Sequence, residues 1–169
     1  RGLIDRQLNE IQGTLFDWND EVARRKTGEW EVETFGRTLD LSQLARGGEG
    51  PHEVYAYTFP SLVALAESRG VDHYPVKIGY TAAASEIAPS LFRIDSQLGD
   101  SSGRFEPATV LAVWNSWNGR KLGARIHSHL RSLKRRLESA IGREWYNTNV
   151  YELRDLLELF VWGMSLVCP

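Results

Sequence analysis

The sequence predicts an α/β domain built on a small, mainly antiparallel sheet of three strands flanked by helices. Three stretches rich in β-branched and aromatic residues carry this prediction, at residues 54–59, 75–81 and 108–116. The first two are joined by a longer connection and can pair antiparallel. The third is nearly all apolar, which is typical of a strand that is buried on both faces.

Residues 1–50 are predicted to form an N-terminal extension of helices and a strand, ahead of a main domain at residues 51–169. Apolar residues recur at helical spacing through residues 1–28, and Gly13-Thr14 divides that stretch into two expected helices. Residues 29–41 alternate in the manner of a strand. The glycine-rich run at residues 47–51 is the clearest linker in the chain, and we place the domain boundary there.

Helices are expected between and after the strands of the main domain. A short helical turn is predicted at residues 62–65, and a helix within residues 82–97 is expected to start near Pro89. The longest predicted helix runs from Arg120 to Ile141, because six Leu and Ile residues in it are spaced 4, 4, 3, 4 and 4 apart.

Gly142 is the expected stop of that helix. A last amphipathic helix is predicted at residues 150–162, and its acidic face is interpreted as solvated.

The charge distribution says more than the net charge of −2. Seven Lys or Arg and no acid lie between Arg120 and Arg136, whereas the first fifty residues carry ten acids against seven bases. The single cysteine, Cys168, excludes an internal disulfide and a zinc cluster of cysteines. No apolar run long enough for a membrane span and no signal peptide is visible, so we expect a cytoplasmic protein that contacts no membrane.

Five short motifs follow one another along the main domain. They are Glu53-Val54-Tyr55, Lys77-Ile78-Gly79, Arg93 on the next helix, Leu122-Gly123-Ala124-Arg125-Ile126-His127, and Glu144-Trp145-Tyr146. Taken in order, over residues 52–150, the set resembles the GIY-YIG nuclease superfamily. The similarity is to its phage-type branch, with a Lys-Ile-Gly second motif and a Glu-Trp-aromatic close.

This resemblance implies a DNA endonuclease that hydrolyses a phosphodiester with a single divalent cation, Mg²⁺ or Mn²⁺. It implies catalytic roles for Tyr55, Lys77, Arg93 and His127, with the tyrosine positioning or activating water and the arginine stabilising the phosphoryl charge. A planar guanidinium suits that task because it binds phosphate through two parallel hydrogen bonds. The expected nucleic-acid contacts are Gly79, Tyr80, Lys134, Arg135 and Arg136. A further specificity domain or partner protein is expected to select the DNA.

The chain departs from the family pattern where the metal-binding glutamate is expected, because that position is Gly123. Glycine inside a helix costs about 0.5–1 kcal/mol relative to alanine and has no side chain to bind a cation. Three interpretations are open: a natural copy that kept DNA binding but lost catalysis, an engineered inactive variant, or a site in which Glu144 supplies the carboxylate. The alternative function is therefore a non-catalytic DNA-binding module on the same fold.

Each candidate residue also has a structural interpretation. Lys77 is either a solvated strand residue or a phosphate contact, and Gly79 either permits close packing or leaves room for the nucleic-acid backbone. Glu144 is either a local clamp or a metal ligand, and Trp117 is a candidate for stacking on bases. A third hypothesis is a protein-interaction module that uses the extension and the acidic last helix.

Overall fold

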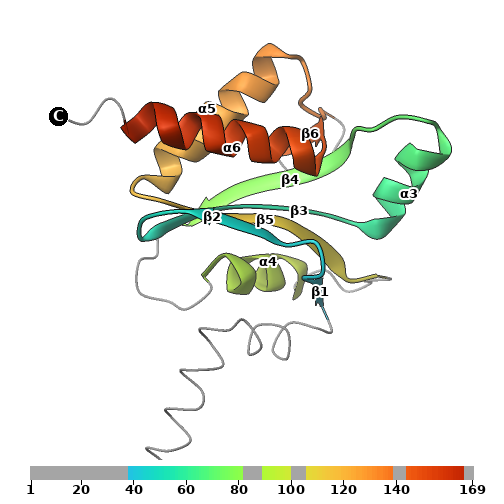
Figure 1. Cartoon of the computed structure of the whole chain (residues 1–169). Helices are drawn as coiled ribbons and strands as arrows, with labels where there is room; N and C mark the ends of the chain where they lie inside the picture. Colours follow the sequence, from blue (N-terminus) through green and yellow to red (C-terminus); the bar gives the residue numbers. More distant parts are fainter. Residues whose placement is uncertain (1–37, 82–88, 100–105, 139–143, 166–169) are drawn as a thin grey trace, which may run out of the picture. The chain divides into compact units, whose positions relative to one another are not determined.

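A six-stranded mixed sheet with the order β1-β5-β3-β4-β6 forms the centre of the fold (Figure 1), and β2 also pairs with β5. The computed structural model describes residues 38–81, 89–99, 106–138 and 144–165. All of these residues belong to one compact unit, Arg37–Pro169. The helices predicted at residues 1–28 and the larger part of the strand predicted at residues 29–41 lie outside the described residues.

The three predicted strands are present and antiparallel. They are β3 (His52–Thr58), β4 (Tyr74–Thr81) and β5 (Ala108–Ser116), with β3 in the middle. The α/β class is therefore confirmed, but the predicted sheet of three strands was too small. The added strands are β1 (Leu39–Asp40), β2 (Ala45–Gly48) and β6 (Trp145–Thr148), each too short to show an alternating pattern of apolar residues.

Two of the added strands come from the segment that was predicted to precede the main domain. β1 and β2 both run parallel to β5. The glycines of β2 allow it to lie flat against Trp114 of β5, because a Cβ at Gly47 would lie 2.4 Å from the indole ring. The glycine-rich run at residues 47–51, which was predicted to be a linker, thus includes the end of β2, where this strand packs closely against Trp114.

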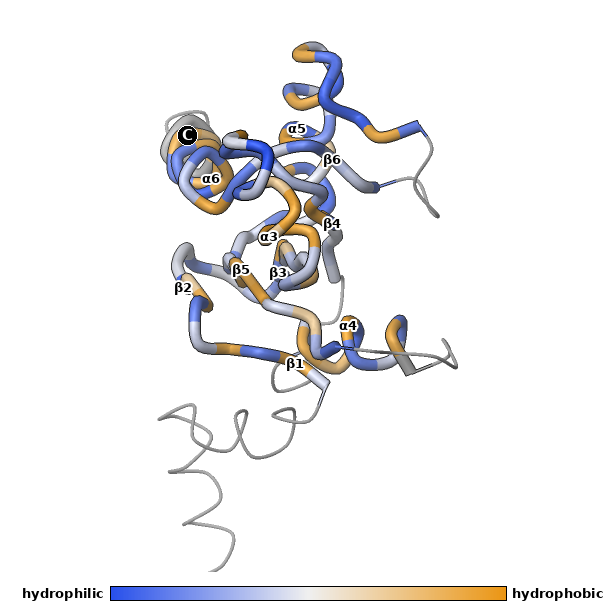
Figure 2. Tube along the Cα trace, turned by 90° about the vertical axis from the view of Figure 1, so that its right-hand side faces the viewer, coloured by the Kyte–Doolittle hydropathy of each residue, from blue (hydrophilic) through white to orange (hydrophobic). Residues whose placement is uncertain are grey.

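Helices cover both faces of the sheet, as the two perpendicular views show (Figures 1 and 2). α4 (Pro89–Gly99) lies against one face of β3 and β4, and α5 (Gly119–Ser132) and α6 (Val150–Ser165) lie on the other face. α3 (Pro60–Ser68) packs at the end where β3 leads into it. No helix within the described residues is both long and apolar enough to span a membrane.

The alternation of β3 and β4 divides their side chains between these two layers. Val54, Ala56, Val76 and Ile78 join the apolar core under α5 and α6. The residues between them therefore face α4. The chemistry-bearing side chains of the first two motifs, Tyr55 and Lys77, lie on that second face.

The predicted long helix was wrong beyond Ser132, where α5 ends. The N–H of Lys134 donates to the Arg131 carbonyl at 2.9 Å and the N–H of Arg135 to the Leu130 carbonyl at 3.0 Å, which is a Schellman arrangement. Lys134 adopts the left-handed conformation that this motif needs, with φ 55°. The chain then turns back beside β6, where Arg136 bridges to Tyr146, so the later leucines of the stripe do not continue a helix.

Replacing Lys134 by glycine is expected to stabilise the protein by about 1 kcal/mol, because a residue with a Cβ pays about that much in the left-handed region. Lys134→Val is expected to destabilise it, since a β-branched residue fits there worst. Chemical denaturation measures both changes. Ser132→Gly, two residues earlier and inside α5, is the control and should lower the free energy of unfolding. A loss of stability in Lys134→Gly would contradict this assignment of the helix end.

Candidate functional site

The Tyr55 ring lies directly over Gly79 on the α4 face of the sheet. The two residues are paired across β3 and β4, and a Cβ built on Gly79 would lie 2.4 Å from both the ring carbon Cζ and the hydroxyl of Tyr55. Only glycine therefore lets the ring cross the backbone of β4. Of the two expected roles of Gly79, close packing is observed, against the Tyr55 ring. A contact of Gly79 with a nucleic-acid backbone stays a prediction.

The Tyr55 hydroxyl is held by two side chains of α4. Arg93 Nε donates to it at 3.3 Å and Gln97 Nε2 at 3.2 Å. Burial raises the pKa of Tyr55 above its ordinary value of 10.0, although these two hydrogen bonds act in the opposite direction. The phenol is therefore neutral at physiological pH and orients the arginine.

Arg93 itself is exposed, between the exposed Phe92 and the buried Ile94. Ile94 is fully buried and faces the sheet, whereas Phe92 is 42% exposed. With Nε bound to Tyr55, the two terminal nitrogens of the guanidinium lie at its far end. They are the groups that bind a phosphate through two parallel hydrogen bonds.

Glu53 fastens the start of α4 to β3. Its side chain is buried, and Oε2 accepts the backbone N–H of Ser90 at 3.0 Å, one residue after α4 begins. A carboxylate at a helix N-terminus also complements the helix dipole. Because α4 carries Arg93, this contact helps to fix the arginine relative to Tyr55.

Lys77 lies on the same face and pairs with Glu144, with 3.3 Å between Nζ and Oε2. Glu144 also acts through space on Tyr55, whose pKa it raises. Lys77 sits between Tyr57 and Trp145, its register partners on β3 and β6. We call Tyr55, Lys77, Arg93, Gln97 and Glu144 together the α4 site.

His127 lies on the opposite face of the sheet, on α5. Its Nε2 is 3.1 Å from the carbonyl oxygen of Ile78, and its ring stacks on Tyr146 with centroids 5.2 Å apart. Because a carbonyl only accepts, Nε2 carries the hydrogen. Burial lowers the pKa of His127 below 6.5, so the ring is neutral. Glu144 and Lys77 of the α4 site act on His127 through space, so the histidine lies within electrostatic reach of that site.

Gly123 faces β4 and lies against Tyr80. A Cβ at this position would lie 3.1 Å from Cδ1 of Tyr80, so a larger residue requires the tyrosine to shift by a few tenths of an ångström. The glycine that departs from the family pattern is thus a point of close helix-to-strand packing. Tyr80, an expected nucleic-acid contact, is half-buried there.

The basic run at residues 131–136 does not form a continuous helix face. Arg135 pairs with Glu152 of α6, and Arg136 Nε lies 3.8 Å from Oε1 of Glu138. Lys134 is exposed in the turn. Of the three expected phosphate contacts at residues 134–136, two are therefore paired with acids.

A divalent cation prefers oxygen ligands, and Mg²⁺ needs one or two carboxylates besides water. Among the described residues, no group of three or more His, Cys, Asp or Glu side chains gathers in a way that could hold a metal. Gly123 has no side-chain oxygen, and the carboxylate of Glu144 already forms an ion pair with Lys77. The residues present at the α4 site therefore do not fit the expected cation.

Two residues of this region were absent from the sequence-based candidates. Gln97 follows Arg93 by four positions, and residues so spaced share a helix face. Glu53 precedes Tyr55 by two positions and so points to the same side of β3. Both periodicities could have indicated them.

In a comparison with known protein families, the T5orf172 domain family matches residues 54–161. This range contains the whole α4 site together with most of β3 and all of β4, β5 and β6. Neither a curated protein nor a solved structure matches the chain.

Replacing Gly79 by alanine is expected to cost about 1–3 kcal/mol of stability, because the new methyl group overlaps the Tyr55 ring. In a Tyr55→Ala background the same change should be almost free, so a double-mutant cycle measures the coupling of the two residues. Urea denaturation gives the four free energies. Gly70→Ala is the control: it is strained by its φ of +66°, touches nothing within 4 Å, and should cost the same in both backgrounds. Equal costs for Gly79→Ala in both backgrounds would contradict the contact.

Proposed function

The chain belongs to the T5orf172 domain family, a nuclease-type family, and from this premise we propose that the α4 site binds the phosphodiester backbone of DNA. The observation that carries the proposal is Arg93, an exposed guanidinium anchored through Nε to a neutral tyrosine. An arginine held in this way presents its terminal nitrogens without losing further side-chain entropy on binding.

Lys77 supplies the second cation of the proposed site. Its ammonium group is mostly shielded from water and is neutralised by Glu144. An incoming phosphate competes with this carboxylate for the ammonium group. Glu144 thus weakens the binding of an anion at the α4 site, while it holds Lys77 in place when no anion is present.

Arg93→Ala is expected to lower the affinity for DNA by about 10- to 150-fold, since a hydrogen bond to a charged group contributes about 1.5–3 kcal/mol. The slope of log affinity against log salt should fall by about one, because one phosphate contact is lost. Glu144→Gln should raise the affinity, because Lys77 is released for the phosphate. Fluorescence anisotropy with a labelled oligonucleotide at several salt concentrations measures both changes.

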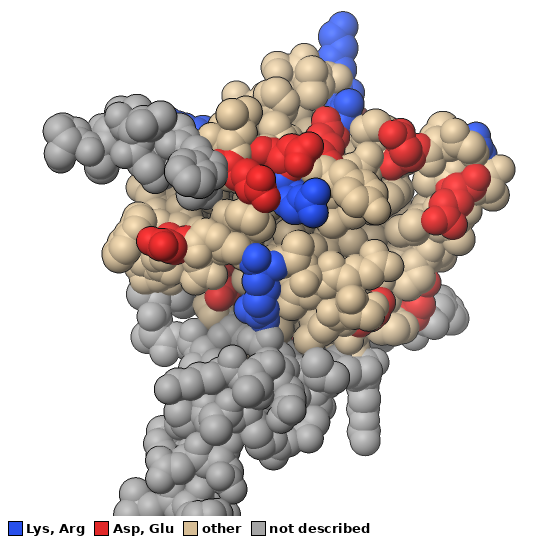
Figure 3. All heavy atoms as spheres, in the orientation of Figure 1, with Lys and Arg blue, Asp and Glu red and all other residues tan. Residues whose placement is uncertain are grey.

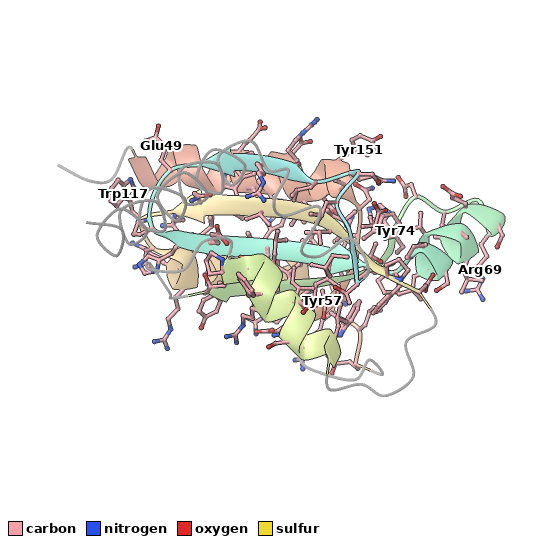
Figure 4. The ribbon with its side chains drawn as sticks, turned by 90° about the horizontal axis from the view of Figure 1, so that it is seen from below. Glu49, Tyr57, Arg69, Tyr74, Trp117 and Tyr151 are labelled. Atoms are coloured by element: carbon pink, nitrogen blue, oxygen red, sulfur yellow. The ribbon has the colours of Figure 1, made fainter. Side chains whose placement is uncertain are left out.

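The matched control is Arg69→Ala, which removes an exposed arginine at the C-terminal end of α3 (Figure 4). It should leave both the affinity and the salt slope unchanged. Equal effects of Arg69→Ala and Arg93→Ala would show that binding follows overall charge and would overturn the assigned site.

A second candidate function is hydrolysis of the bound DNA, as the resemblance to GIY-YIG nucleases implies. Glu144 favours it, because this carboxylate lies close enough to shift the pKa of both Tyr55 and His127. The lack of fit to a cation argues against it in this chain. Binding and hydrolysis are separable, because binding requires only the positively charged side chains of Arg93 and Lys77.

This chain is expected to leave plasmid DNA intact in Mg²⁺ or Mn²⁺, whereas Gly123→Glu is expected to produce nicked product. The new carboxylate would be the ligand that the family pattern places there. Gly123→Gln has the same shape without the charge and should stay inactive, as should Gly123→Glu combined with Arg93→Ala. Gel electrophoresis of the plasmid resolves nicked from closed circles. Cleavage by the unaltered chain would show that another carboxylate suffices, with Glu144 the first to replace.

A further inference from the structure

Among the described residues, the aromatic side chain with the largest exposed fraction is that of Trp117, between β5 and α5. Its side chain is 75% exposed, although tryptophan is usually largely buried. The turn that carries it is well anchored: Asn118 N–H donates to Ser116 Oγ at 3.1 Å, and the Asn118 side chain accepts from Lys121 N–H at 2.9 Å. An indole on such a turn is presented to solvent at little further cost in entropy.

Trp117 lies at the end of the sheet where α5 begins. Gly119, the first residue of α5, is close enough that a Cβ there would lie 3.3 Å from the Thr81 carbonyl of β4. Thr81 is four residues along β4 from Lys77, a separation of about 13 Å. Figure 4 places Trp117 beside Glu49 and away from the end of the sheet where Arg69 lies.

The helix that starts beside Trp117 is basic. α5 contains Arg120, Lys121 and Arg125 and no acid, and in the described part of the structure none of these three cations takes part in an ion pair. Glu49, which directly follows β2 in the chain, is an exposed acid. The surface therefore combines an indole with unneutralised positive charge.

We infer that Trp117 and the first turn of α5 form a second nucleic-acid subsite, which takes an unpaired base on the indole and its phosphate on Arg120 and Lys121. This inference rests on the proposed function and narrows its substrate to nucleic acid with a single-stranded segment. A base offers its face to an indole only when it is not stacked inside a duplex, and such stacking is tolerant of sequence. Base-paired DNA would use the α4 site alone.

The acidic surface of α6 offers a matched control. On the face seen in Figure 3, Asp and Glu side chains gather over α6, which carries Glu152, Asp155 and Glu158. Tyr151 of the same helix is an aromatic residue 69% exposed. Tyr151 differs from Trp117 chiefly in the sign of the charge around it.

The test is the affinity of the full chain for a labelled single strand of about ten nucleotides and for the blunt duplex of the same sequence. Trp117→Ala is expected to weaken binding of the single strand about tenfold and binding of the duplex less than twofold. Trp117→Phe should retain most of the affinity, Glu49→Gln should raise it, and Tyr151→Ala should leave it unchanged. Thermal melting of each variant confirms that the fold is kept.

The outcomes separate this inference from the proposed function. If Trp117→Ala binds the single strand as tightly as the unaltered chain while Arg93→Ala binds it weakly, the subsite is wrong and the α4 site stands. If no form of nucleic acid binds any variant, both are wrong. If Trp117→Ala leaves binding unchanged but dissociates an oligomer in sedimentation, the indole joins copies of the chain, and the inference is overturned.

Discussion

The contact between Tyr55 and Gly79 is the constraint on which the α4 site depends. A tyrosine on the central strand can reach the outer edge of its neighbour only where that neighbour has no Cβ. The ring then brings its hydroxyl under α4, where Arg93 and Gln97 bind it. One glycine thus connects two strands and a helix, and the position of the exposed guanidinium follows from it. The carboxylate of Glu53 fixes the start of the same helix to the same strand, so Ser90, Arg93 and Gln97 attach three successive turns of α4 to β3.

The distribution of ion pairs decides which of the many cations can meet a polyanion. In the sequence, the basic residues from 120 to 136 form one run. In the structure they divide into two groups: those of α5, without acidic partners among the described residues, and those after Ser132, of which Arg135 and Arg136 pair with acids. Glu152 accepts from both Arg135 and Thr148 and so ties α6 to the turn and to β6. The net charge of −2 therefore describes neither the basic surface of α5 nor the paired charges around Glu152.

The parts of the fold that follow from local pattern were predictable. β3, β4 and β5 have the residue types and lengths of strands, and the alternation of β4 puts Lys77 on the same face as Gly79. The end of α5 was not predictable, because the leucine spacing continues through residues 133 and 137, whose roles change once Lys134 enters the left-handed region. Lysine has no preference for that conformation, so its presence in the sequence does not indicate the turn. β1 lies at the end of the strand predicted at residues 29–41, whereas β2 and β6 were missed because strands of four residues exist only through their pairing with distant segments.

The site shows the same division between local and distant signals. Arg93 and Lys77 were found from motifs, but the reason for Gly79 lies on another strand and could not be read from its own neighbours. Gly123 can be described in two ways. In the family pattern it is the position of a lost metal ligand, and in the structure it is a packing position against Tyr80. Both descriptions hold if the loss of the carboxylate allowed α5 to approach β4. In that case restoring the glutamate works against the packing that replaced it, so a gain of cleavage in that variant requires the half-buried Tyr80 ring to yield at small cost.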